Sequence, residues 1–152
     1  MRIFLTNIIL LISIASATDT SKVVETHKNG NISMISYYAD TEKGLELIKQ
    51  ETFHFTGPKS MVGVFKDGLR DGTWSYWHGN GQIRLQGNYE KGFKTQLWTR
   101  WYENGIIATK YYYDNTTSDG KVMDWHIDKE CWDINNNECE CGENWWDDCE
   151  NH

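Results

Sequence analysis

A repeat of 24 residues constrains this 152-residue chain more than any other feature of its sequence. The hexapeptide that begins at Gly63, Gly-Val-Phe-Lys-Asp-Gly, recurs at Gly87 as Gly-Asn-Tyr-Glu-Lys-Gly. The segment 74–83 recurs in the same way as 98–107, with both tryptophans and the Asn-Gly pair kept. A fixed period of this length indicates an array of small units, each of which covers part of the next.

Four units of this array begin at equivalent positions, Ala39, Gly63, Gly87 and Tyr111. A degenerate half-unit around Asn29 precedes them and is displaced by an insertion of three residues. In the fourth unit, the period predicts that Trp125 and His126 take the places that Trp101 and Tyr102 have in the third.

Each unit has the pattern of a β-hairpin. The segments 73–78 and 82–89 are rich in aromatic and branched side chains with partial alternation, and they are bounded by Asn-Gly, Asp-Gly or Lys-Gly pairs. Such pairs tolerate the positive φ of tight hairpin turns. No segment has a convincing amphipathic helical pattern. We therefore predict an all-β fold, a single-layer antiparallel sheet of successive hairpins with period 24.

The pattern Gly-x-Phe/Tyr-x-x-Gly, followed by Gly-x-Trp-x-x-Trp-x-x-x-Asn-Gly, resembles the MORN repeat, especially its bacterial variant, the YwqK-like antitoxin family. The resemblance covers residues 39–128. It implies a sheet of hairpins without known catalytic residues, acting in scaffolding or protein contact. The chain departs from the pattern at three places: Thr95-Gln96 replaces Asp71-Gly72, Tyr111 stands at the position of Gly87, and Thr56-Gly57 replaces Asn-Gly.

Residues 1–17 have the pattern of a signal peptide. Arg2 supplies the cationic start, residues 3–14 form an apolar run, and Ala15-Ser-Ala17 is a small-x-small cleavage site. The apolar run contains polar residues and is shorter than the roughly 20 residues of a membrane span. We expect cleavage before Thr18 and export to the periplasm or the medium, without membrane insertion of the mature protein.

The expected organisation has four parts: a signal peptide at 1–17, a half-repeat at 18–38, the repeat array at 39–130, and an acidic, cysteine-rich cap at 131–152. All cysteines lie in the cap, at positions Cys131, Cys139, Cys141 and Cys149. In an exported chain they predict two disulfides that staple a cap over the open sheet edge. The first cysteine pairs with the third and the second with the fourth, or the first with the second and the third with the fourth.

The charge is uneven along the chain. Residues 18–113 have 12 basic and 10 acidic side chains, whereas residues 114–152 have 2 basic and 12 acidic ones. An acidic end without a basic stripe disfavours nucleic acid and anionic lipid as partners. No nucleophile–base pair, phosphate loop or metalloprotease motif is present, so we predict neither an enzyme nor a cofactor.

His54, His78 and His126 share one repeat position, and Tyr102 fills the remaining slot. Equivalent residues in successive hairpins are two strands, about 9–10 Å, apart, too far to share a zinc ion. We therefore expect a position for a flat amphipathic ring and no metal site. The acidic segment 133–137 is similar to the start of a calcium loop but lacks its turn glycine.

The aromatic residues are the candidate binding residues. Strand alternation places Trp74 and Tyr76 on one face and Trp77 on the other. We expect Trp77 and Trp101 to form the core. The opposite rings form the candidate exposed binding face, at Trp74, Tyr76, Trp98 and Tyr102. This face predicts a protein-binding or scaffolding module. The alternatives are a carbohydrate-binding module that uses the same rings and a toxin-neutralising antitoxin.

The signal peptide predicts the amino terminus of the mature protein. The mature protein, recovered from the periplasm or the medium, should begin at Thr18 by amino-terminal sequencing or intact mass. A cytoplasmic product that keeps Met1 would contradict export and would favour the antitoxin alternative.

Overall fold

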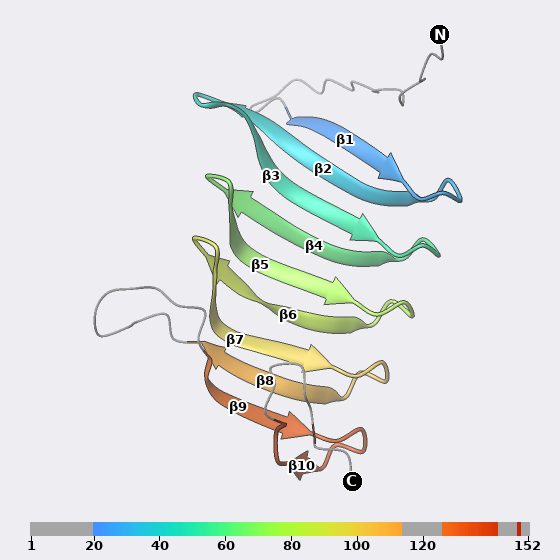
Figure 1. Cartoon of the computed structure of the whole chain (residues 1–152), viewed down its shortest axis with the longest axis vertical. Helices are drawn as coiled ribbons and strands as arrows, with labels where there is room; N and C mark the ends of the chain where they lie inside the picture. The colour runs from blue at the N-terminus through green and yellow to red at the C-terminus, as the bar shows by residue number, and fades with distance from the viewer. Residues whose placement is uncertain (1–19, 114–125, 143–148, 150–152) are drawn as a thin grey trace, which may run out of the picture.

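The structure is a computed structural model that describes residues 20–113, 126–142 and 149. The signal peptide and Trp125 therefore lie outside the described residues. The described residues form one open antiparallel sheet whose ten strands follow one another in chain order, with no helix (Figure 1). The strands are β1 (Thr20–Thr26), β2 (Ile32–Thr41), β3 (Gly44–Phe53), β4 (Lys59–Lys66), β5 (Leu69–Trp77), β6 (Ile83–Glu90), β7 (Phe93–Trp101), β8 (Ile107–Tyr113), β9 (His126–Trp132) and β10 (Glu138–Cys139). The predicted fold class is confirmed.

At one end of the sheet, two-residue loops join the paired strands. Lys66 pairs with Leu69 across the loop Asp67-Gly68, and Lys91-Gly92 has the same place between β6 and β7. All four loop residues have positive φ, from 50° to 90°. This is the combination that a type I′ turn requires, and its twist matches that of the flanking strands.

At the other end, a five-residue turn recurs with one hydrogen-bond pattern. The amide of its first residue donates to the carbonyl of its fifth, and the amide of its fourth donates to the carbonyl of its first, at 2.7–3.0 Å. The first residues of the five turns are His27, His54, His78, Tyr102 and Asp133. The array therefore has a fifth turn, inside the segment that the sequence assigned to the cap.

The fifth turn corrects the alignment of the fourth unit. Asp133, not His126, corresponds to Tyr102, and Trp132 precedes it as Trp101 precedes Tyr102. His126 is the first residue of β9 and pairs with Tyr113. The fifth turn follows the fourth after 31 residues instead of 24, because the connection between β8 and β9 is longer than the other hairpin loops.

The core lies on one face of the sheet, between β4 and β8. We call it the aromatic face and define it by its buried rings, Trp74, Tyr89, Trp98, Tyr111 and Tyr113. Neighbouring rings meet edge to face, with 5.5 Å between the centroids of Trp74 and Tyr89 and 5.0 Å between those of Tyr89 and Trp98. Because a single-layer sheet has no second layer, these rings bury one another.

The burial of the tryptophans is the reverse of the prediction. Trp74 and Trp98, expected on an exposed face, are 2% and 1% exposed, whereas Trp77 and Trp101 are only half-buried. The reason is a glycine on the preceding strand. Trp74 lies directly over Gly63, at a position where a Cβ atom would overlap its indole ring, and Trp98 lies over its glycine in the same way.

The departures at Gln96 and Tyr111 have structural explanations. Gln96 keeps the positive φ, 60°, that Gly72 has in the previous unit, so the backbone bulge is conserved between units although the residue differs. Tyr111 can replace a glycine because its partner on β9 is Lys129, so no indole ring needs the space.

Two disulfides staple the end of the array. Cys131 bonds to Cys141 and Cys139 to Cys149, with Cα–Cα distances of 5.4 and 5.6 Å, so the first of the two open pairings is the one formed. Cys131 belongs to β9, which crosses the expected boundary between array and cap. Disulfides of this kind indicate an oxidising environment outside the cytoplasm.

The glycine–tryptophan contact predicts the effect of one methyl group. Gly63→Ala should lower the free energy of unfolding by about 1–3 kcal/mol, because the new Cβ overlaps the indole ring of Trp74. Gly79→Ala is the matched control, since its Cβ would meet no atom within 4 Å and its φ is not positive. Urea unfolding measures both, and equal stabilities would contradict this view of the core.

Candidate functional site

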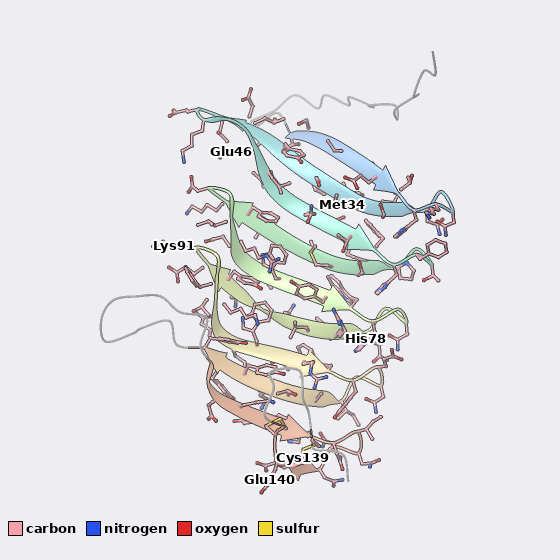
Figure 2. The ribbon with its side chains drawn as sticks, in the orientation of Figure 1. Met34, Glu46, His78, Lys91, Cys139 and Glu140 are labelled. Atoms are coloured by element: carbon pink, nitrogen blue, oxygen red, sulfur yellow. A yellow bond between two sulfur atoms is a disulfide. The ribbon has the colours of Figure 1, made fainter. Side chains whose placement is uncertain are left out.

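A hollow of about 330 Å³ opens over β6, β7 and β8 and has buried rings of the aromatic face in its lining. Other side chains of β6 and β7 and the turns that follow β5 and β7 complete the lining; Figure 2 shows His78 at the first of these turns. The hollow is lined by His78, Arg84, Leu85, Lys94, Trp98, Arg100, Trp101, Tyr102, Glu103, Tyr111 and Tyr113.

The floor of the hollow is held in place by hydrogen bonds and ring packing. The indole Nε1 of Trp98 donates to the carbonyl of Asn88 at 3.0 Å, and its ring packs against Tyr89. Tyr111 and Tyr113 beside it are also buried. Rings fixed in this way hold the shape of the hollow, so a ligand does not have to order it first.

Among the described residues, the lining contains three lysine or arginine side chains and one carboxylate. Arg84 is exposed, and the Nζ of Lys94 lies 5.3 Å from the ring centroid of Trp98 and donates to the hydroxyl of Tyr113 at 3.2 Å. Arg100 donates to the Thr109 hydroxyl at 3.2 Å. The exposed guanidinium of Arg84 is the group of this lining that can bind a carboxylate with two hydrogen bonds.

Two of the four predicted binding residues line the hollow. Trp98 and Tyr102 do, whereas Trp74 and Tyr76 lie in the preceding unit. Tyr76 is half-buried beside Trp74, with 6.4 Å between the ring centroids, and burial raises its pKa, with a smaller contribution from Tyr89. The four rings therefore do not form the exposed row that alternation predicted.

The repeat itself explains why the hollow lies in the third unit. The position that Tyr76 has beside Trp74 is taken by Arg100 beside Trp98, so a guanidinium group replaces a ring. Lys94 keeps the position of Arg70, which covers Trp74 at 4.6 Å. Sequence reasoning missed Arg84, Lys94 and Arg100, although comparison of the two units would have shown the exchange of Tyr for Arg.

The repeat position shared by the histidines makes hydrogen bonds to backbone carbonyls. In each of the first four turns, the ring of the first residue hydrogen-bonds to the carbonyl that precedes the next turn: His27 to Phe53 at 3.0 Å, His54 to Trp77 at 2.9 Å, His78 to Trp101 at 2.9 Å and Tyr102 to Trp132 at 2.9 Å. A histidine N–H and a tyrosine O–H can both make this bond. Within the described residues, no cluster of His, Cys, Asp or Glu could hold a metal ion.

A second ladder joins the same turns. The side-chain amides of Asn29, Asn80 and Asn104 donate to carbonyls of the following turn at 2.9–3.3 Å. The second turn has Thr56 at this position, and its side chain makes no such bond among the described residues. The departure noted in the sequence is thus one missing bond of the ladder.

The segment at Asp133 closes the array as a turn. The carboxylate of Asp133 accepts hydrogen bonds of 2.8 Å from the backbone amides of Asn135 and Asn137 and from the side chain of Asn137. The side chain of Asn137 is the main cause that lowers the pKa of this carboxyl. These bonds give Asp133 and Asn137 a role in the backbone of the turn.

No protein-family model matches the chain, and no curated protein or solved structure matches it. The resemblance to the MORN repeat therefore stays a prediction from the sequence pattern. In the part of the chain that the structure describes, no helix is long and apolar enough to span a membrane.

A substitution at Thr56 can restore the side-chain hydrogen bond that the second turn lacks. Thr56→Asn should raise the free energy of unfolding by about 0.5–1.5 kcal/mol, because its amide can donate to the next turn as Asn80 does. Thr56→Asp is the control, since a carboxylate has nearly the same shape but cannot donate. Urea midpoints compare the two variants, and an equal effect of Asn and Asp would show that the amide makes no such bond.

Proposed function

We propose that this protein is an exported, non-catalytic protein-binding module that contacts its partner through the hollow on the aromatic face. The observation that carries the proposal is a preformed hollow with an aromatic floor and the exposed Arg84 in its lining, on an open sheet. Interfaces are typically dominated by a few aromatic and arginine side chains around an apolar centre.

The lining indicates which kind of partner surface fits. The exposed Arg84 favours a carboxylate, and the half-buried Leu85, Trp101 and Tyr102 of the same lining favour an apolar side chain next to it. An acidic side chain beside a hydrophobic one, on the surface of a folded protein or on an extended segment, meets both requirements.

The carbohydrate alternative has less support. Stacking on a sugar requires an exposed ring face, whereas Trp74 and Trp98 are almost fully buried. Only the half-buried Trp101 and Tyr102 remain for this role. The two disulfides support export, because they persist in oxidising compartments such as the periplasm or the medium.

The experiment uses a photo-reactive amino acid in place of an exposed glutamate, in the exported protein of its own host. Glu103 lines the hollow, and Glu90, at the far end of β6, is the matched control. We expect a specific protein adduct from position 103 and none from position 90. Equal adducts from both positions, or an adduct with a polysaccharide, would contradict the proposal.

Charge reversal at Arg84 then tests the lining of the hollow, with the partner that the cross-linking experiment identifies. Arg84→Glu should weaken binding at least about tenfold, which corresponds to about 1.4 kcal/mol. Lys66→Glu makes the same change of charge at an exposed position outside the hollow and should leave the affinity almost unchanged. Isothermal titration calorimetry measures both affinities.

A further inference from the structure

The two edges of the sheet differ in their capacity to pair with another strand. β1 has seven residues, and among the described residues it pairs with β2 alone, so its outer side presents backbone groups that no described strand pairs (Figure 1). β10 has only two residues, and the disulfide from Cys139 anchors it. Unpaired backbone groups along a full-length edge strand are a template for a further strand.

Lys22 is the one basic side chain of β1, a type that commonly protects a sheet edge, but its Nζ lies over the ring of Tyr37 on the neighbouring β2, 5.8 Å from the ring centroid. Every residue of β1 except Ser21 is exposed, and Val23 and Val24 present an exposed apolar side chain on each face, 50% and 41% accessible. The strand contains no proline, and its register irregularity lies at its end, between Glu25 and Thr26. Natural sheets commonly use proline, bulges or short strands to block such an edge, as β10 does at the other end.

We infer that β1 pairs with β1 of a second copy of this chain, antiparallel and about a twofold axis at Val23. An axis perpendicular to the sheet leaves each side chain on its own face, so residues that face each other must differ by an even number of positions. The register centred on Val23 meets this condition. Because Val23 is the midpoint of Thr20–Thr26, this register also pairs all seven residues.

This register gives partners to the side chains of the edge. Val23 faces Val23 of the second copy, and Ser21 faces its Glu25. The Ser21 hydroxyl is buried and has no hydrogen-bond partner among the described residues. Side chains directly opposite in an antiparallel pair have Cβ atoms about 4.5–5.5 Å apart, so a χ1 rotation brings the hydroxyl to the Glu25 carboxylate.

The difference between the two edges favours pairing of β1 with itself. Pairing of β1 with β10 of another copy would be head to tail and would continue into a filament. β10 has two residues and covers only Cys131 and Trp132 of β9, so that edge is stepped, whereas β1 presents seven residues in one line. Pairing of β1 with itself consumes the open edge of both copies, so the assembly closes as a dimer with one continuous sheet.

Cysteine cross-linking of the mature protein tests the register. In Val23→Cys, the two Cα atoms across the axis lie about 4.5–5.5 Å apart, within the range of a disulfide. In Val24→Cys they are diagonal neighbours, about 7–8 Å apart, beyond that range. Peptide mapping distinguishes the new bond from the two native disulfides.

We expect the wild-type protein to sediment as a concentration-dependent dimer, and mild oxidation to link Val23→Cys several-fold more than Val24→Cys. A wild-type protein that stays monomeric at every concentration, species larger than a dimer, or equal linkage of the two variants would overturn the inference. The experiment does not involve the hollow, so its result is independent of the proposed function.

Discussion

The packing of an indole ring on a glycine of the neighbouring strand is the contact on which this sheet depends. Trp74 and Trp98 can be buried in a single layer only because Gly63 and Gly87 leave room above the backbone. Each indole N–H donates to a carbonyl of the preceding strand, at Val64 for the first ring and at Asn88 for the second. Burial, hydrogen bonding and strand register are therefore satisfied by the same side chain.

The turns provide a second, polar connection between units. Histidine, tyrosine and asparagine side chains join each turn to the next, so the end of the sheet opposite the type I′ loops is held by side chains as well as by strand pairing. With the core and the turns holding the architecture, single positions can vary between units. The exchange of Tyr76 for Arg100 is such a variation, and Arg100 lines the hollow that we propose as the binding site.

The sequence predicted the hairpins, their order and the open sheet, because Asn-Gly, Asp-Gly and Lys-Gly pairs specify turns by local backbone chemistry. It did not predict which face is buried. Alternation shows that Trp74 and Trp77 lie on opposite faces, but the choice between them depends on Gly63, a residue of another strand. The alignment of the fourth unit failed for a similar reason, because a longer connection shifts the period and only the backbone pairing reveals Asp133 as the next turn.

The sequence by itself determined the repeat, the all-β class, the presence of two disulfides and the ring-bearing position of the turns, all of which follow from residue spacing along the chain. Only the tertiary structure decided the disulfide pairing, the burial of Trp98 and the placement of Arg84, Lys94 and Arg100 around one hollow. The physical reason is the range of the interactions. Turn chemistry acts within a few residues, whereas ring burial and side-chain clusters depend on contacts between strands whose register the spacing alone does not specify.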